Sequence, residues 1–343
     1  MSKMEINNRI IGDREPAYII AEGCDNHMGD IAAAKEMALR AKLAGADCIK
    51  FQHHLPDEEM LPEVPMSGNF DIPLYEFLKL HALKLEQHIE LKEYCDQIGI
   101  TYLCTPFCYK AAKELYDAGI VYAFKIGSGE MTDIPSLRKI AEFGCPMIIS
   151  SGMCTLTELD RTYKALRGKV PLAFTNCLSE YPPIYEDVNL GVLKKLRERY
   201  PDVVIGHSDH TPDLYTCYAA VALGASIIEK HVILDKIVPG PDQTVSIDFS
   251  ELHALVDGVH KVEKALGDEK KVCPREEAIR QWAFRSIVST REIKCGDIIE
   301  EGMVWSKRPG TGIPSYKIPE IIGRKAKRDI PCNTLLRYED LDE

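Results

Sequence analysis

Short apolar runs alternate with amphipathic helical patterns eight times along roughly the first 270 residues, and this alternation allows very few folds. The runs are rich in β-branched and aromatic residues, which is typical of strands buried on both faces. The first helical pattern begins at Asp30, a good N-cap, and ends at Gly45, a good C-cap. The expected strands cover residues 17–23, 47–52, 100–107, 122–129, 147–152, 172–177, 203–208 and 226–234.

Eight strand–helix units predict a (β/α)8 barrel, the TIM-barrel fold of the α/β class. A doubly wound sheet is the alternative, but it needs fewer strands and usually a glycine-rich turn after the first one. The segment "AEGCDNHMG" after the first run does not have the G-x-G-x-x-G pattern. We therefore expect a barrel domain over residues 1–270, with an N-terminal hairpin that plugs its bottom.

The pattern changes beyond the barrel. Residues 271–284 are a charged connector and are expected to form a linker. Residues 285–343 contain short alternating runs with turn signals every few positions, as in "RSIVSTREIKCGDIIEEGM". These features predict a second domain that is small and mostly β.

Charge and composition exclude several classes of partner. The formal net charge is -11, which argues against nucleic acid or an anionic membrane as the main partner. No apolar run is long enough for a membrane span, and the N-terminal segment lacks the apolar core of a secretory signal. We therefore expect a cytoplasmic protein whose twelve cysteines, none in a C-x-x-C pair, are reduced thiols.

Polar residues gather where the expected strands end. The carboxyl ends of all eight strands of a barrel meet on one face, which is where active sites lie. Two lysines among hydroxyls and glycines predict a site for phosphate and carboxylate. A strand-end salt bridge is the structural alternative for either lysine alone. The residues of this ring are Glu22, Asn26, His27, Lys50, Gln52, Thr105, Lys125, Ser128, Glu130, Ser150, Ser151, Asn176, Ser179, Ser208, Asp209, His210, Glu229, Lys230 and His231.

Two histidines end neighbouring expected strands, in "GHSDHT" and "EKHVILD". His210 and His231, with carboxylates nearby, suit one divalent metal ion, and two imidazoles leave positions open for water and substrate. Hydrogen-bonded core histidines are the structural alternative. Glu22 and Glu130 are then candidate acid–base catalysts.

Ten motifs in a fixed order resemble the sialic acid synthase family, which joins phosphoenolpyruvate (PEP) to an N-acylated hexosamine. The resemblance covers nearly the whole chain, and the C-terminal part resembles the antifreeze-like (SAF) domain. The motifs are "AEGCDNHMGD", "ADCIKFQ", "TPF", "KIGSGE", "SSGM", "EYPPIYEDVNL", "GHSDHT", "ALGASIIEKH", "PGPD" and "KRPGTGI".

The resemblance implies roles for individual positions. His210 and His231 match the ligands of Mn²⁺ or Mg²⁺, which polarises the sugar aldehyde for attack by PEP. Glu22 matches a group that guides the attacking water, and Glu130 matches one that either handles protons or binds the sugar. Arg308 reaches the partner subunit's site in relatives, which implies a domain-swapped homodimer. The PEP site matches Lys50, Thr105, Lys125, Ser128, Ser150, Ser179 and Ser208, and the sugar site matches Asn69, Tyr181, Asp242 and Arg308.

Several positions depart from the family pattern and leave the acceptor sugar open. They are expected near the sugar half of the site: Cys24, Asp25, Asn176, Leu178, His207 and Gln243. N-acetylmannosamine or a relative is the first expectation, and a diacetamido-trideoxyhexose of the legionaminate or pseudaminate pathway is the alternative. A pyruvate Schiff-base aldolase and a non-catalytic binding scaffold are further alternatives, against which the paired lysines and histidines argue.

Overall fold

The computed structural model describes residues 2–65, 68 and 70–342. The chain divides into two compact units, Met1–Gly267 and Asp268–Glu343, called here the barrel unit and the C-terminal unit. Asn69, predicted to bind sugar, lies outside the described residues.

The barrel unit contains eight parallel strands that close on themselves, as predicted. Each strand pairs with the next along the chain, and β10 pairs with β3 to complete the ring. The strands are β3 (Tyr18–Glu22), β4 (Cys48–His53), β5 (Thr101–Pro106), β6 (Phe124–Ile126), β7 (Met147–Ser150), β8 (Leu172–Cys177), β9 (Val204–Asp209) and β10 (Ile227–His231).

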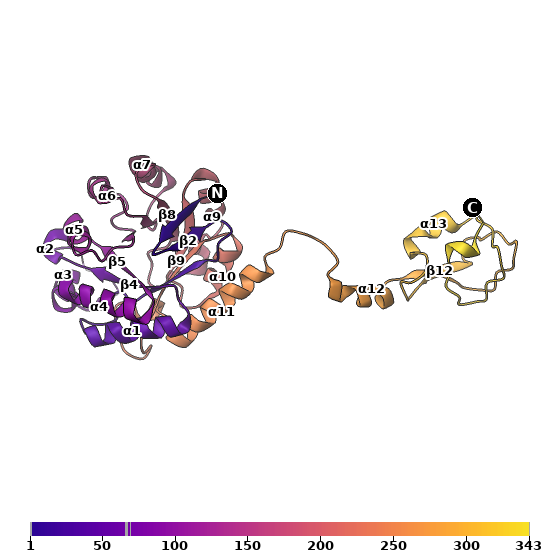
Figure 1. Ribbon diagram of the computed structural model, residues 1–343, viewed down its shortest axis with the longest axis horizontal. Helices are drawn as coiled ribbons and strands as arrows, with labels where there is room; N and C mark the ends of the chain where they lie inside the picture. Colours follow the sequence, from indigo (N-terminus) through magenta and orange to yellow (C-terminus); the bar gives the residue numbers. More distant parts are fainter. Residues whose placement is uncertain (1, 66–67, 69, 343) are drawn as a thin grey trace. The chain divides into compact units, whose positions relative to one another are not determined.

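Helices surround the strands (Figure 1). The first begins after Asp30, whose side chain accepts a hydrogen bond from the Ala32 N–H, and ends at Gly45 with φ 93°, as the sequence predicts. The outer helices are α1 (Ile31–Ala44), α4 (Leu85–Ile98), α5 (Tyr109–Asp117), α6 (Ile134–Ala141), α7 (Leu156–Leu166), α9 (Val192–Arg199), α10 (Tyr215–Ala222) and α11 (Phe249–Ala265). Shorter ones lie in loops: α2 (Pro56–Glu59), α3 (Leu74–His81), α8 (Tyr185–Val188) and η1 (Gln243–Val245).

The lower interior of the barrel is apolar and is closed by a hairpin, as predicted. Alternate residues of each strand point inward. Ile20, Cys48 and Ile148 are among those that form one buried cluster. Met4 and Ile11 join the cluster from the antiparallel pair β1 (Lys3–Ile6) and β2 (Arg9–Gly12). Inward-pointing polar groups are therefore left to the carboxyl ends of the strands.

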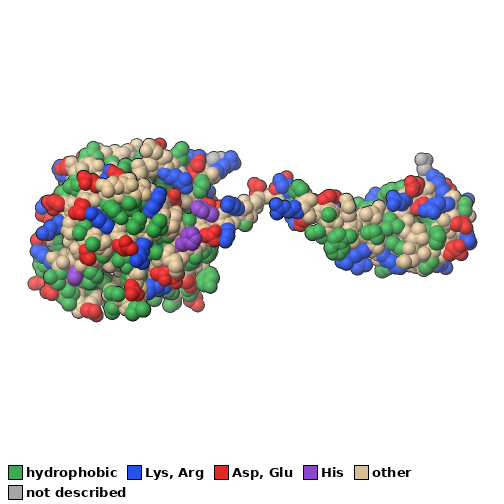
Figure 2. Space-filling model, turned by 60° about the horizontal axis from the view of Figure 1, so that its bottom comes forward, with side chains coloured by type: hydrophobic (Ala, Val, Ile, Leu, Met, Phe, Trp, Pro, Cys, Tyr) green, Lys and Arg blue, Asp and Glu red, His purple; other side chains and the backbone are tan. Residues whose placement is uncertain are grey.

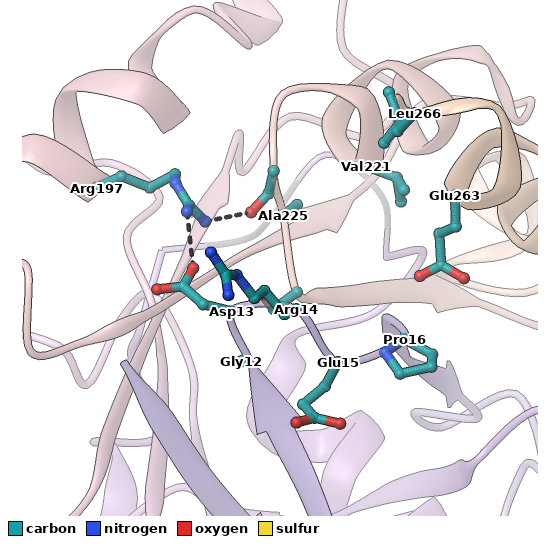
Figure 3. Close-up of a pocket in the computed structure, with 12 residues that line it drawn as sticks. Gly12, Asp13, Arg14, Glu15, Pro16, Arg197, Val221, Ala225, Glu263 and Leu266 are labelled. Carbon is teal, nitrogen blue, oxygen red and sulfur yellow. Dashed lines mark hydrogen bonds and ion pairs between the residues drawn. The ribbon is translucent and has the colours of Figure 1, made fainter. Parts of the chain in front are cut away.

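A cavity of about 480 Å³ opens beside this hairpin, below α9, α10 and α11 (Figure 3). Two of its charged groups bind each other: Arg197 donates to Asp13 Oδ1 and also to the Gly224 carbonyl, each at 2.7 Å. The Glu263 carboxylate accepts the Ala17 N–H at 2.5 Å. These contacts join the hairpin to the helical layer, and they satisfy groups that would otherwise bind a ligand.

The C-terminal unit has its own buried apolar cluster, which includes Ile287, Ile299 and Leu336. Its strands β11 (Ser286–Ser289) and β12 (Val304–Lys307) are antiparallel, and single bridges join the remaining segments. Hydrophobic side chains show on its surface near α12 (Figure 2). The segment expected as a linker contains helical turns. The helical elements are η2 (Pro274–Glu276), α12 (Glu277–Ala283), η3 (Ser315–Lys317), α13 (Ile318–Ile321) and η4 (Tyr338–Asp340).

Candidate active site

A cavity of about 390 Å³ lies at the carboxyl ends of the barrel strands. Every strand from β3 to β10 contributes to its lining, so the topology alone brings distant parts of the sequence together. Of the predicted site residues, those lining it are Glu22, Lys50, Thr105, Lys125, Ser128, Glu130, Ser150, Ser179, Tyr181, Ser208, His210, His231 and Asp242.

One side of the cavity is built around two buried lysines. Lys50 lies 2.5 Å from Glu22 and donates to the Thr105 hydroxyl at 3.0 Å. Lys125 donates to the Ser150 hydroxyl at 2.7 Å. Because both ammonium groups are held among hydroxyls at the top of the barrel, this side suits the binding of an anion.

Glu229 lies between the two lysines. Its Oε1 is 3.4 Å from Lys125 Nζ and 3.9 Å from Lys50 Nζ, and it accepts the Ser208 hydroxyl at 2.9 Å. Burial alone would raise the pKa of Glu229, but Lys125 and Lys50 lower it. Burial would lower the pKa of Lys50, but Glu22 and Glu229 raise it, so Lys50 stays charged.

Gly152 separates two of the predicted PEP serines. Its N–H donates to the Ser128 hydroxyl at 3.0 Å. A Cβ at this position would lie 2.3 Å from Ser179 Oγ and 2.6 Å from Ser128 Oγ. Only a residue without a side chain lets both hydroxyls approach the same point.

Gly152→Ala is therefore expected to raise the KM for PEP by about 10- to 100-fold, because the added Cβ would displace both serine hydroxyls by up to about 1 Å. Steady-state kinetics would measure this. Gly191→Ala is the matched control, since a Cβ there meets no atom within 4 Å and Gly191 does not line the cavity. Equal KM values for the two variants would contradict a role of these serines in PEP binding.

The opposite side of the cavity contains the two histidines. Their ring centroids are 5.0 Å apart. His210 Nδ1 donates to the Leu178 carbonyl at 2.7 Å, and Nε2 lies 3.1 Å from the Tyr181 hydroxyl. Burial by itself lowers the pKa of His210, but Cys177 and the Leu178 carbonyl raise it to about 9. A cation that binds at Nε2 therefore releases a proton.

His231 is buried, and among the described residues its Nδ1 has no hydrogen-bond partner. Asp242 Oδ2 is 4.0 Å from this nitrogen. Cys24, which the sequence placed only near the site, has its Sγ in the same group. A buried imidazole nitrogen without a partner beside a carboxylate fits a metal ligand better than it fits a core histidine.

A third wall is acidic and is arranged around His54, which the sequence analysis missed. His54 Nδ1 lies 2.9 Å from Glu59 Oε1, and the ring stacks on Phe107 with centroids 4.1 Å apart. Burial raises the pKa of Asp25 to about 6 and that of Glu130 to about 7, the latter aided by Glu59. His54 directly follows β4, so its position in a strand-end segment was the available signal.

Because the pKa of Glu130 is raised, this residue is predicted to lower the free energy of unfolding in a pH-dependent way. Below about pH 4.5 the carboxyl is protonated in both the folded and the unfolded chain, and it does not lower this free energy. As pH rises through 4.5 to about 7, the unfolded chain ionises first and wild-type stability falls. Glu130→Gln should therefore gain about 2–3 kcal/mol relative to wild type between pH 4.5 and 8, measured by chemical denaturation. The exposed Glu142→Gln is the control, and a flat difference for Glu130→Gln would contradict the prediction.

A second polar cluster lies outside the barrel strands, against α10. Lys230 is fully buried and donates to Asp209 Oδ2 at 2.6 Å. His207 Nε2 lies 3.2 Å from Asp209 Oδ1, and Thr216 donates to the same oxygen at 2.9 Å. Burial would raise the pKa of Asp209, but His207 and Lys230 hold it well below its usual range. This network joins the end of β9, which His210 directly follows, to the end of β10, where His231 lies.

The residues that depart from the family pattern fall into two groups: some lie at the cavity or beside His231, and the others lie elsewhere. Asp25 lines the cavity and Cys24 lies beside His231. His207, Asn176 and Leu178 do not line the cavity, and His207 Nδ1 lies 3.1 Å from the Asn176 carbonyl. Gln243 donates to the Lys236 carbonyl at 2.5 Å. Arg308 belongs to the C-terminal unit, where its guanidinium lies over the Trp282 ring at 5.4 Å.

Residues 37–271, most of the chain, match the family model described as "NeuB family". The chain belongs to the NeuB family. Residues 284–342 match the SAF domain, so the resemblance seen in the sequence motifs is confirmed for both parts of this NeuB-family chain. Among the described residues, no helix has the length and apolar character needed to cross a membrane.

Relatives of this NeuB-family chain make different products. It is 35% identical to N,N'-diacetyllegionaminic acid synthase of Legionella pneumophila over 96% of each chain. It is 36% identical to pseudaminic acid synthase of Campylobacter jejuni over 98% of this chain and 99% of the relative. The crystal structure of N-acetylneuraminic acid synthetase from Leptospira borgpetersenii, in complex with citrate, has a TM-score of 0.72 and 30% identity, and it covers 81% of this chain and 95% of that one. Identity alone does not choose among these sugars.

Proposed function

We propose that this enzyme condenses PEP with the open-chain form of an N-acetylated amino sugar and releases a nonulosonic acid and phosphate. One observation supports this most: a buried pair of lysines among hydroxyls faces a pair of histidines across a single cavity. The lysine side suits a molecule with phosphate and carboxylate groups. The histidine side suits the activation of a second substrate.

The PEP side acts mainly through charge. Lys50 and Lys125 would neutralise PEP and then the departing phosphate, and the serines and Thr105 would orient them. The methylene carbon of PEP attacks the aldehyde carbon, water adds to the former C2 of PEP, and the bond from that carbon to the phosphate oxygen breaks. Burial raises the pKa of Glu22, although Lys50 opposes this, so Glu22 suits acceptance of a proton from that water.

The histidine side fits a divalent metal. His231 Nδ1 is buried without a partner among the described residues. Nδ1 of His210 is bound to the Leu178 carbonyl, so a metal would bind at Nε2, which lies 3.1 Å from the Tyr181 hydroxyl. Mn²⁺ or Mg²⁺ held by His210 and His231 would supply Lewis-acid polarisation of an aldehyde oxygen. Tyr181, stacked on His210 with ring centroids 4.3 Å apart, would then position the sugar.

The acceptor is proposed as N-acetylmannosamine or a close relative, because Asp25 and Glu130, which line the cavity, can form hydrogen bonds with several sugar hydroxyls. A 6-deoxy diacetamido sugar is the second candidate. The part of the cavity lined by Phe70, Leu74 and Leu78 favours it, since these side chains suit a methyl group.

A Schiff-base aldolase is a poorer fit to the same lysines. Such an enzyme needs a lysine with a lowered pKa, whereas the carboxylates Glu22 and Glu229 raise the pKa of Lys50. Borohydride treatment in the presence of pyruvate tests this alternative directly. Covalent trapping at Lys50 or Lys125 would favour the aldolase over the synthase.

We also propose a domain-swapped homodimer. Arg308 lies over the Trp282 ring, and Trp282, Phe284 and Trp305 of the same unit are each more than half exposed. Aromatic residues and arginine are typical of interface centres. Light scattering should give twice the chain mass, and Trp305→Glu should shift it toward the monomer.

The proposed function is tested with purified protein, PEP, Mn²⁺ and three acceptors in separate reactions: N-acetylmannosamine, diacetamido-trideoxymannose and diacetamido-trideoxyaltrose. Phosphate release and product mass are followed. Turnover with one acceptor that is abolished by EDTA and by His210→Ala supports the synthase and identifies the sugar. A folded, metal-binding protein that releases no phosphate with any acceptor would overturn the proposal.

A further inference from the structure

Cys24 adopts a backbone conformation that disfavours its own side chain. Its φ is 38°, in the left-handed region that glycine adopts without steric strain and other residues rarely adopt. The preceding Gly23 is equally constrained, because a Cβ there would lie 2.5 Å from the Phe51 ring. This turn after β3 thus fixes the direction of the Cys24 side chain. A strained non-glycine residue beside a predicted metal ligand, here His231, is a reason to look for a function.

The side chain of Cys24 points to a group of metal-binding atoms. Its Sγ, a His231 ring nitrogen and an Asp242 oxygen all lie within 4.8 Å of one another. Cys24 is completely buried and His231 is 5% exposed, and Nδ1 of His231 has no hydrogen-bond partner among the described residues. An imidazole nitrogen that is desolvated without a partner costs free energy unless something else binds it.

The other deeply buried cysteines do not share these features. Cys48 and Cys104 lie within strands and Cys95 and Cys217 lie within helices, and none of these four has a positive φ. They pack as small apolar side chains. All twelve cysteines are in the described part of the chain and none forms a disulfide, so the position of Cys24 is not explained by a crosslink.

We propose that Cys24, as a thiolate, and Asp242 complete the metal centre at His231, and that this centre prefers thiophilic divalent ions such as Fe²⁺, Co²⁺ or Zn²⁺ over Mg²⁺. Thiolate is a soft ligand that selects against the hard cations Mg²⁺ and Ca²⁺. On binding, a metal–sulfur bond forms and the thiol proton passes to solvent. The inference rests on the metal centre proposed above and deepens it by giving that centre two further ligands.

The test uses cobalt as a spectroscopic probe of the full-length, metal-stripped protein in oxygen-free buffer with a phosphine reductant. Titration with Co²⁺ should produce near-ultraviolet absorption from thiolate-to-cobalt charge transfer, together with visible bands from the ion itself. Cys24→Ser should lose the near-ultraviolet band and bind Co²⁺ at least about tenfold more weakly. A large excess of Mg²⁺ should displace Co²⁺ from this variant more readily than from wild type.

Cys177→Ser is the matched control, because Cys177 lines the active-site cavity and its Sγ lies 3.9 Å from Nδ1 of the other histidine, His210. It should keep the charge-transfer band. Cys24→Gly, which relieves the left-handed backbone, provides a second variant should Cys24→Ser fold poorly, and it too should lose the band.

The outcomes separate this inference from the proposed function. Visible cobalt bands that need His231 but come without a charge-transfer band would overturn the role of Cys24 and leave the two-histidine centre standing. A band lost in Cys177→Ser and kept in Cys24→Ser would also overturn it. Wild-type protein that binds no Co²⁺ yet turns over in EDTA would overturn both the thiolate ligand and the metal-dependent mechanism.

Discussion

Lys125→Met is expected to reduce phosphate release from PEP by about 10³-fold, because it removes one of two fixed positive charges from the site where phosphate departs. Methionine preserves most of the side-chain volume but cannot neutralise an anion. The loss should be seen in both kcat and KM, since Lys125 would contact PEP in the ground state and the leaving phosphate in the transition state. Calorimetric titration with PEP would measure the binding part separately.

Lys139→Met is the control for this substitution. Lys139 is exposed on α6, with its Nζ over the Tyr109 ring at 5.0 Å, and it does not line the cavity. The Lys139→Met variant should have the same activity as the wild-type enzyme. If Lys125→Met retained more than about a tenth of the activity in a folded protein, the electrostatic role given to this lysine would be wrong.

Lys230→Met is expected to lower the free energy of unfolding by about 3–5 kcal/mol, since it leaves the Asp209 carboxylate buried without its cation. Lys230 does not reach the cavity, so the loss reports on the network behind β9 and β10 and not on substrate binding. Chemical denaturation followed by circular dichroism is the suitable measurement. Both tryptophans, Trp282 and Trp305, lie in the C-terminal unit, so their fluorescence does not report the barrel.

Two comparisons make this prediction specific. Lys261→Met breaks the exposed pair with Asp257, and it should have little effect on the free energy of unfolding, because solvent screens that pair. The double variant Asp209→Asn/Lys230→Met removes both charges and should recover much of the loss. A cost for Lys230→Met no greater than that for Lys261→Met would show that the buried pair contributes little.

The sequence predicted the barrel, its hairpin plug and most of the polar ring, because each rests on a local period or on the rule that strand ends converge. His231 and Lys230 show the limit of that reasoning. Both are polar residues at one strand end, but the alternation of a strand sends them to opposite faces. Counting from the inward-facing Ile227 would have separated them. Cys24, His54 and Asp25 follow strand ends in irregular turns, for which no period gives a side-chain direction.

The hairpin β1–β2 has a consequence for the route and the order in which substrates bind. In the described part of the chain it fills the lower end of the barrel, so ligands pass through the upper opening. Lys50 and Lys125 come two residues after the apolar interior residues Cys48 and Ala123, whereas His231 comes four after Ile227. The anion site is therefore the deeper one. A sugar bound near the upper opening would block access of PEP to the deeper anion site. PEP should therefore bind before the sugar, and excess sugar should inhibit the enzyme by binding before PEP.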